Sequence, residues 1–458
     1  MIVAPVERSL TQPLHNKELM PTLLQQPSTE TLAREWPALS SIARLTAFNA
    51  LPRGEMDDFF LQLDPREQAQ LILSLPEAEH RIWIRLLAPD DTADLLQNVS
   101  APDRDHLLSD LDASTQREVT ALLAYKEDVA GGRMSPRYAR LRPEMTVDEA
   151  LAYLRHQAAQ VETIYYAYAL DTEQHLKGVI SLRDLFSSDR TKIVQDLMRT
   201  RFISVPEFED QEAIAKLFNQ HHLLAIPVVD AEQRMMGIVT VDDIVAVVQQ
   251  EASEDIQKAG GTEALDGPYL EVSILGMVKK RAGWLAVLFL GEMLTATAMG
   301  YFEDEIAKAV VLALFLPLII SSGGNSGSQA TTLVIRAMAI GEVRLKDWWR
   351  VMRRELLVGT ALGMVLAVIG LARILVWHAV RGTYGEHYLL IALTIASSLV
   401  GVVLFGSIAG SMLPFILRRV GLDPASASAP FVATLVDVTG LVIYFSVASF
   451  ILRGTLLR

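Results

Sequence analysis

Residues 429–452 read APFVATLVDVTGLVIYFSVASFIL, an apolar run that is long enough to cross a membrane as a helix and is interrupted by the carboxylate of Asp437. Four further apolar stretches precede it: Trp284 to Phe302, Ala309 to about Met338, Leu356 to Val380, and Tyr388 to Leu417. Each can cross about 30 Å of hydrocarbon. The sequence therefore predicts a transmembrane domain of five helices over residues 282–458.

Charge is distributed unevenly along the 458 residues. Residues 1–281 hold 28 Lys and Arg against 44 Asp and Glu, a net charge of -16, whereas residues 282–458 hold 13 against 10, a net charge of +3. An acidic surface repels nucleic acid and attracts cations, so a divalent metal ion is favoured as a partner and nucleic acid is not. The alternative is that the acidity only keeps this region soluble. The absence of cysteine excludes disulfides, thiolate metal sites and cysteine nucleophiles.

Basic residues indicate the orientation in the membrane. Lys279, Lys280 and Arg281 precede the first span, and further Arg and Lys residues lie in the second and fourth connections. The positive-inside rule then places the N-terminal domains in the cytoplasm and the C-terminus outside, in a plasma (inner) membrane. Residues 1–30, rich in Pro, Gln and Thr, are expected to form a flexible tail and not a signal peptide.

Residues 31–132 have an internal period of twelve residues. Most of the repeated apolar residues are followed at once by a helix-starting Pro, Ser or Asp; they are Leu51, Leu63, Leu75, Leu87, Val99, Leu111 and Leu123. The pattern predicts short helices, end to end, stacked into a small right-handed superhelix. A helical bundle with a chance period is the alternative.

Residues 133–196 and 197–243 contain a duplication. Gly178-Val-Ile-Ser181-Leu-Arg-Asp184 matches Gly237-Ile-Val-Thr240-Val-Asp-Asp243 at a constant offset of 59, and each copy has the pattern helix, strand, turn, strand, helix. The expected helices are Val147–His156 and Gln211–Gln220. The pair resembles the tandem cystathionine-β-synthase (CBS) regulatory domains, an α+β fold. In that family the hydroxyl and carboxylate can contact a nucleotide ribose, so ATP or another adenine nucleotide is a candidate ligand of Ser181, Asp184, Thr240 and Asp243; helix capping is the alternative.

The last helix of the second copy continues as an acidic connecting helix over residues 244–262, followed by a linker at 263–281. Its carboxylates include Glu251, Glu254 and Asp255, beyond Asp242 and Asp243. Like charges at this spacing destabilise a helix unless a cation bridges them. Two explanations of this acidic pattern stay open. The helix is part of a switch that depends on a bound cation, or its acidic face is only solvated.

Polar residues within the spans are the candidate ion pathway. A carboxylate at the bilayer centre costs roughly 2.5–3.5 kcal/mol, which makes a functional role the default for Asp437; a buried hydrogen-bonding role is the alternative. Mg²⁺ prefers oxygen ligands of this kind. In the second span Asn325 and Gln329 are spaced i, i+4 and present amide oxygens on one face, as a pore wall or as polar contacts between helices.

Two strings within the spans carry a more specific resemblance. Gly323-Gly-Asn-Ser-Gly-Ser-Gln329 and Pro430-Phe-Val-Ala-Thr-Leu-Val-Asp437-Val-Thr-Gly440, with the domain order, resemble the MgtE family of magnesium channels over about residues 31–458. The resemblance implies a homodimer whose pore is lined by spans two and five. It implies that Asp437 selects the ion, that Asn325, Gln329 and Gly440 line the path, and that Asp423 lies near the cytoplasmic mouth.

The same resemblance implies regulation by the transported ion. The connecting helix would be the plug helix of the family, and cytoplasmic Mg²⁺ would close the pore by bridging carboxylates at Glu212, Asp243, Glu251, Glu254 and Asp255. The sequence departs from the family pattern at Ala246, where another acid is expected. Glu292, inside the first span, receives no role from the sequence.

Two other classes of protein were weighed. A CBS-regulated membrane enzyme such as a metalloprotease requires a His-Glu-x-x-His zinc helix, which the sequence lacks. A CBS-gated anion channel requires more spans and basic anion sites, and Asp437 opposes it. We therefore expect a channel or transporter and not an enzyme, with Mg²⁺ as the ion and Co²⁺ or Mn²⁺ as the alternative cargo.

Overall fold

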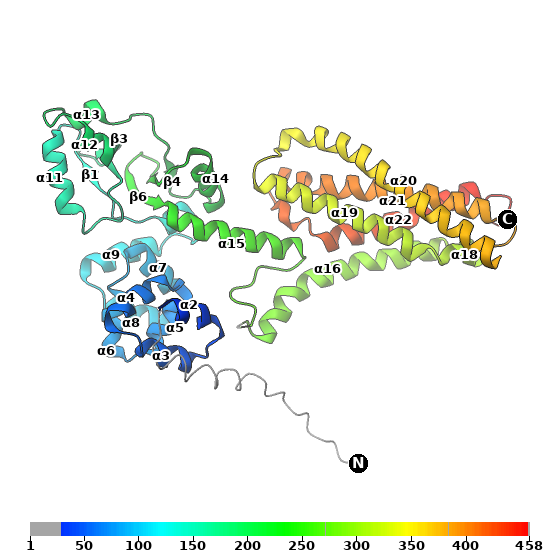
Figure 1. Ribbon diagram of the computed structural model, residues 1–458, viewed down its shortest axis with the longest axis horizontal. Coiled ribbons are helices and arrows are strands. Elements are labelled where there is room, and N and C mark those ends of the chain that lie inside the picture. The colour runs from blue at the N-terminus through cyan, green and yellow to red at the C-terminus, as the bar shows by residue number, and fades with distance from the viewer. Residues whose placement is uncertain (1–28, 271, 383, 457–458) are drawn as a thin grey trace, which may run out of the picture. The chain divides into compact units, whose positions relative to one another are not determined.

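The computed structural model describes residues 29–270, 272–382 and 384–456. The chain divides into two compact units at Gln249 and Gln250, and each is described here by itself (Figure 1). The predicted N-terminal tail falls almost wholly on residues 1–28, outside the described residues. Within the described part, the three predicted fold classes are confirmed: an all-helical first domain, an α+β pair and five helices long enough to cross a membrane.

The first domain is a series of short helices. They are α2 (Thr29–Glu35), α3 (Ser41–Asn49), α4 (Arg53–Gln62), α5 (Pro65–Ser74), α6 (Glu77–Ile84), α7 (Pro89–Gln97), α8 (Ala101–Ser109) and α9 (Ala113–Leu122). The side chains of Asp64, Ser100 and Asp112 accept hydrogen bonds from backbone N–H groups of the helices that follow them. These caps satisfy N–H groups that have no partner within the helix, which explains why each helix begins there.

The period of twelve residues corresponds to one helix and its connection. Leu63 and Leu75 are the C-cap residues of α4 and α5, and like Leu51, Leu87, Val99 and Leu111 they are buried. Each repeated residue thus fills the space between consecutive helices. Because helices of two or three turns bury little surface alone, this shared core holds the domain together.

Each CBS copy contains a three-stranded sheet. In the first, β1 (Arg140–Leu141) pairs parallel with β2 (Tyr166–Leu170), which pairs antiparallel with β3 (Leu176–Ser181). In the second, β4 (Val205–Pro206), β5 (Ala225–Val229) and β6 (Met235–Thr240) repeat that order. The helices of the pair are α10 (Ala130–Arg133), α11 (Val147–Gln157), α12 (Leu182–Ser187), α13 (Val194–Leu197) and α14 (Gln211–His221).

The connecting helix is α15 (Val241–Ala259), which is continuous with the second copy and ends at Gly260 and Gly261. Gly261 has φ of 75°, a left-handed conformation that terminates helices and suits glycine. The residues after it are only partly a linker, because α16 (Ile274–Tyr301) begins ten residues before the predicted start of the first span at Trp284. Ser273 caps this helix, so its first turns are stable although they carry Lys279, Lys280 and Arg281.

The membrane unit continues with α17 (Glu303–Lys308), α18 (Val310–Ala313), α19 (Leu316–Ala339), α20 (Trp348–Arg381), α21 (Tyr388–Arg419) and α22 (Ala429–Ile451). Its central helices α19, α21 and α22 pack closely (Figure 1). A Cβ on Gly406 or Gly410 of α21 would lie 2.3 and 2.1 Å from the backbone oxygens of Gly323 and Gly327 of α19. Small residues are required at these crossings because the two backbones are in contact.

Candidate functional site: acidic clusters and a polar membrane face

Carboxylates from both parts of the first unit meet around Asp243. Asp90 and Asp91 lie in the first turn of α7, Asp242 and Asp243 lie in the first turn of α15, and Glu162 lies in the loop before β2. Asp90 is buried, Asp243 is partly buried, and the other three are exposed. The cluster therefore has a buried centre and an open rim.

The pKa values in this cluster are shifted in the direction that burial and mutual repulsion produce. Burial raises the pKa of Asp90 well above its usual value, and Glu162, Asp91 and Asp243 add to this effect. Burial also raises the pKa of Asp243 to about 7, although a hydrogen bond of 2.6 Å from Thr240 Oγ1 opposes the shift. The buried Oδ1 atom of Asp90 has no hydrogen-bond partner among the described residues. An added cation would relieve both the repulsion and this unmet hydrogen-bonding capacity.

Two arginines of the described chain lie beside the cluster: Arg137, whose charge acts on Glu162, and Arg133. Arg133 Nη1 lies 3.0 Å from Asp94 Oδ2, and Arg133 Nε donates to Gln211 Oε1 at 3.2 Å. Burial nevertheless raises the pKa of Asp94 to about 6. Among the described residues, no three carboxylates of this region converge to within 4.8 Å of one another. The arrangement therefore suits a hydrated ion bound through retained waters more than an ion coordinated directly by three carboxylates.

The other predicted regulatory residues lie apart from this cluster or on α15. Glu212, in the first turn of α14, pairs with Lys216, with Nζ 2.7 Å from Oε1. Glu251, Glu254 and Asp255 are all partly buried on α15. The predicted set is therefore divided: Asp243 belongs to the cluster of the first unit, whereas the three acids of α15 belong to the second unit with the membrane helices.

Lys258 connects the end of α15 to the loop before α22. Its Nζ atom lies 2.7 Å from Asp423 Oδ2 and also pairs with Glu254. Asp423 has a second role, because its Oδ1 accepts a hydrogen bond from Ala425 N at 2.8 Å. Burial favours the neutral amine, but the two carboxylates outweigh it and raise the pKa of Lys258. Asp423, predicted near the cytoplasmic mouth, is thus neutralised by a side chain of α15.

Three of the four predicted nucleotide contacts are engaged at helix N-termini: Ser181 caps α12, and Thr240 is bonded to Asp243 at the start of α15. Ser181 Oγ accepts a hydrogen bond from Asp184 N at 3.1 Å, and Thr240 Oγ1 donates to Asp243 Oδ2 at 2.6 Å. Asp184 also lies near Arg199, with 3.7 Å between Oδ2 and Nη2. Asp243 faces the acidic cluster, where an anionic phosphate would be repelled.

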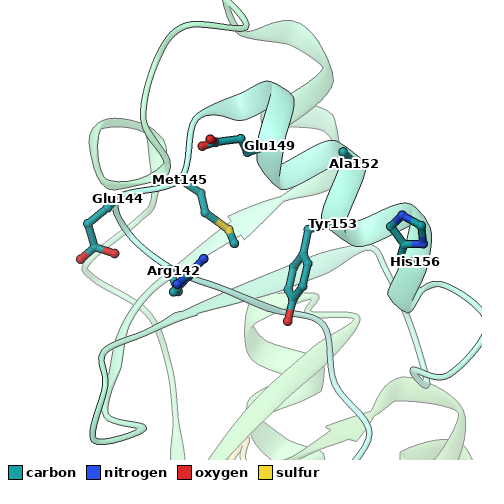
Figure 2. A pocket seen from close by; sticks show the side chains of 7 residues that line it. All are labelled: Arg142, Glu144, Met145, Glu149, Ala152, Tyr153 and His156. Atoms are coloured by element: carbon teal, nitrogen blue, oxygen red, sulfur yellow. The ribbon is translucent and has the colours of Figure 1, made fainter.

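An open groove of about 550 Å³ lies elsewhere in the first CBS copy (Figure 2). The side chains that line it are Arg142, Glu144, Met145, Glu149, Ala152, Tyr153 and His156. Figure 2 shows Tyr153 extending below α11, between Arg142 on one side and His156 on the other. The groove therefore combines an aromatic ring with a guanidinium, and the four predicted nucleotide contacts are not part of it.

In the second span, polar residues form a stripe along α19. Ser321, Asn325, Gln329 and Thr332 follow one another at intervals of three or four residues, and all four are exposed in the single chain. The opposite face is buried: Thr331 Oγ1 donates to the carbonyl of Gly410 at 2.8 Å. Exposed amides do not face hydrocarbon without a large cost, so this stripe lines water or contacts a second protein surface.

Asp437 lies on α22 close enough to Glu292 of α16 for the two carboxylates to interact. Glu292 receives no role from sequence pattern alone, and the structure places this second intramembrane carboxylate beside the first. Gly440, one turn after Asp437, is buried, and a Cβ there would lie 3.0 Å from Val402 Cγ1. In the single chain Gly440 is therefore a packing residue, and its place on the ion path stays a prediction.

Comparison with known proteins decides the family. The MgtE divalent cation transporter family matches residues 316–447, the MgtE intracellular N domain matches residues 28–128, and the CBS domain matches residues 127–190 and 194–250. The magnesium transporter MgtE of Thermus thermophilus is 39% identical over 435 residues, which cover 94% of this chain and 95% of the relative. The chain belongs to the MgtE family of magnesium transporters. As an MgtE protein it is a multi-pass membrane protein with an N-terminal domain of the intracellular type, and it is not an enzyme.

Other MgtE proteins match over shorter lengths. That of Enterococcus faecalis is 35% identical over 337 residues, covering 73% of this chain and 72% of the relative, and that of Bacillus subtilis is 32% identical over 397 residues, covering 86% and 85%. The crystal structure of the cytosolic domain of the Mg²⁺ channel MgtE in complex with ATP has 38% sequence identity and a TM-score of 0.46, covering 50% of this chain and 94% of that one.

Several residues that contact these sites lie far from them in the sequence, and the sequence alone does not indicate these contacts. Asp90 and Asp91 were not identified as partners of Asp243, because two acids in the first turn of a helix are explained by the helix dipole. Lys258 was not identified as the partner of Asp423. In the case of Glu292, a weak signal was present, since an unassigned carboxylate in a span is functional by default.

Proposed function

We propose that this chain forms a homodimeric Mg²⁺ channel that carries the ion into the cytoplasm along the interface between two subunits. The observation that supports it most directly is the exposed polar stripe of α19, with Asn325 and Gln329 at its centre. A second copy, related by twofold symmetry, would cover this face and enclose a path lined by hydroxyl and amide oxygens. The N-terminal domains would lie in the cytoplasm and the C-terminus outside, as the basic connections indicate.

Asp437 supplies the charge for ion selection in this proposal. Two subunits would contribute two copies, each with the second carboxylate of Glu292 nearby, and a bound cation would offset the repulsion between the carboxylates. Hard oxygen donors of this kind favour Mg²⁺ over softer ions such as Co²⁺, and a sparse carboxylate site suits an ion that keeps part of its hydration shell. Mg²⁺ is therefore preferred to Co²⁺ as the cargo, whereas Mn²⁺ suits the same donors and stays the alternative.

Cytoplasmic Mg²⁺ would close the channel by acting on the acidic groups of both units. A cation would stabilise the carboxylates of the first unit, where Asp90 is buried and burial raises the pKa of Asp243. In the second unit, Glu251, Glu254 and Asp255 place further acids on α15, close to the membrane helices in sequence. An ion that binds one conformation better than the other shifts the equilibrium toward it, which is the physical basis of this gating proposal.

An adenine nucleotide is the proposed second ligand of the CBS pair. The groove of Figure 2 has the volume of a small-molecule site and offers Arg142 to phosphate and Tyr153 to a base. Calorimetry with ATP should show binding that Arg142→Ala weakens and Ser181→Ala leaves unchanged. If Ser181→Ala weakens binding and Arg142→Ala does not, the nucleotide binds at the residues predicted from the sequence.

Transport is tested with the purified protein in liposomes that contain a Mg²⁺-sensitive dye. The wild type should take up Mg²⁺ along a gradient, Asp437→Ala should abolish uptake and Glu292→Gln should reduce it. The matched control is Glu386→Gln, an exposed acid in the loop before α21. If Asp437→Ala takes up Mg²⁺ like the wild type, the proposed path is wrong.

A further inference from the structure

A cluster of metal-binding side chains lies in the first domain, and the proposed transport function does not use it. His80, His106 and Asp110 each offer one ligand atom, and the three atoms lie within 4.8 Å of one another. His80 lies on α6, His106 lies in the last turn of α8, and Asp110 is the C-cap residue of α8. The spacing of His106 and Asp110 is i, i+4, which places both on one face of the helix.

The tautomer of His80 leaves one ring nitrogen available as a ligand. His80 is 5% exposed, and its Nε2 atom lies 3.1 Å from the carbonyl oxygen of Leu75. A carbonyl oxygen only accepts hydrogen bonds, so Nε2 carries the hydrogen and, in a neutral ring, Nδ1 carries a lone pair. A metal-bound histidine typically donates its other N–H to a backbone carbonyl in this manner.

Two buried acceptor atoms of the cluster have no partner. His80 Nδ1 and Asp110 Oδ2 are both inaccessible to solvent, and neither has a hydrogen-bond partner within the described part of the chain. A buried lone-pair acceptor that has no partner loses its hydration without replacement. A bound cation satisfies both atoms at once.

The geometry needs only a small adjustment to bind such an ion. Ligand atoms bound tetrahedrally to Zn²⁺ at about 2.1 Å lie about 3.4 Å apart, so separations of up to 4.8 Å must shorten by at most about 1.4 Å. His106 is exposed, and rotation of its side chain can supply this movement. The rings of His80 and His106 already face each other edge to face, with 6.2 Å between their centroids.

We propose that His80, His106 and Asp110 form a binding site for a first-row transition ion of the Zn²⁺ class, which joins α6 to α8. Two imidazoles and one carboxylate select such ions over Mg²⁺, which binds imidazole poorly. The exposed side of the cluster leaves a fourth position to water. In a chain without cysteine, histidine pairs are the strongest donors for these ions, so competing sites are few.

The test measures Zn²⁺ binding by titration calorimetry on the full-length protein in detergent, with any histidine tag removed and excess Mg²⁺ present. The wild type should bind about one Zn²⁺ per chain at this site, and the thermal midpoint of the first domain should rise. His106→Ala changes an exposed residue, and we expect its affinity for Zn²⁺ to be at least about tenfold weaker. Asp110→Asn should weaken binding in the same direction.

The control is His221→Ala, an exposed histidine on α14, which should bind Zn²⁺ like the wild type. The proposal is overturned if His106→Ala and Asp110→Asn bind Zn²⁺ as the wild type does, or if the wild type binds none. The second outcome would indicate that a proton shared between His80 and Asp110 takes the place of the metal. Neither result depends on Mg²⁺ flux, so the site is tested independently of the transport function.

Discussion

Lys258 Nζ lies 2.7 Å from Asp423 Oδ2 and also pairs with Glu254, so a protein cation lies between two carboxylates that the sequence assigns to ion binding. Both carboxylates are partly exposed. The contact joins the end of α15 to the loop before α22. It supplies an attraction between the two segments that adds to the bridging by Mg²⁺ proposed for the other carboxylates of α15.

Replacement of Lys258 should therefore weaken closure. Partly exposed ion pairs contribute about 1 kcal/mol, which corresponds to a factor of about five in an equilibrium constant. In Lys258→Gln we expect the cytoplasmic Mg²⁺ concentration that closes half of the channels to rise about fivefold. The measurement is Mg²⁺ flux into liposomes preloaded with increasing Mg²⁺ on the cytoplasmic side.

Two controls accompany this prediction. Lys258→Arg keeps the charge and should close like the wild type, and Lys280→Gln removes a similar ion pair, with Asp266 at 2.7 Å, elsewhere in the second unit. If Lys258→Gln closes at the wild-type Mg²⁺ concentration, the contact does not contribute to gating.

Neutralisation of the acids on α15 should change gating and leave permeation intact. In the triple variant Glu251→Gln, Glu254→Gln and Asp255→Asn, bridging by Mg²⁺ is lost, so current should persist at cytoplasmic Mg²⁺ levels that close the wild type. Loss of the repulsion between these acids favours closure. This effect should be the smaller one, because neutral side chains supply no attraction in place of the bridging ion. Mg²⁺ should also cease to protect the chain from limited proteolysis.

The control for the triple variant neutralises three acids of α4, Glu55, Asp57 and Asp58, and should leave closure unchanged. A triple variant of α15 that closes as the wild type does would place the sensor in the first unit, around Asp90 and Asp243.

The acidic cluster should make the stability of the first unit depend on pH and Mg²⁺. Asp243 has a folded-state pKa of about 7, above its unfolded value, so the folded state holds the proton more tightly. Its contribution is fully present below the unfolded pKa and is lost as pH rises through about 7. In the presence of a chelator, the thermal midpoint should fall as pH rises from 6 to 8. Each kcal/mol of unfolding free energy that is lost should lower the midpoint by roughly 2–4 °C.

Mg²⁺ should raise the thermal midpoint again at the higher pH. Asp243→Asn should remove much of the pH dependence and much of the Mg²⁺ effect. Asp57→Asn, at an exposed position on α4, is the matched control and should keep them. A midpoint that stays constant or rises over this pH range would show that burial of Asp243 has no cost.

The exposed stripe of α19 should be covered by a second subunit. The chain has no cysteine, so single introduced cysteines report proximity without background. Asn325→Cys should form crosslinked dimers in membranes, whereas Leu357→Cys, on an exposed apolar position of α20, should not. Efficient crosslinking at Leu357→Cys alone would place the interface on another helix.

Much of the architecture could be predicted from local pattern. The twelve-residue period predicted helices whose caps Asp64, Ser100 and Asp112 are observed, because capping depends on residues two or three positions apart. The spacing of Asn325 and Gln329 predicted a shared face, and both are exposed. These features depend on periodicity along one helix, which a sequence displays directly.

Contacts between distant segments could not be predicted in this way. Asp90 meets Asp243 only because α7 packs near the start of α15, and Glu292 meets Asp437 only because α16 packs against α22. The start of α16 was placed too late because three basic residues in its first turns resemble a loop, whereas Ser273 caps the helix before them. Tertiary packing decides such cases, and it has no local signature.

The central claim is tested most directly by Mg²⁺ current through the wild-type channel in inside-out patches while Mg²⁺ on the cytoplasmic face is varied. We predict a current when cytoplasmic Mg²⁺ is absent, progressive closure as it is added, and reopening when it is removed. Absence of any Mg²⁺ current, or a current that cytoplasmic Mg²⁺ does not reduce, would contradict the account.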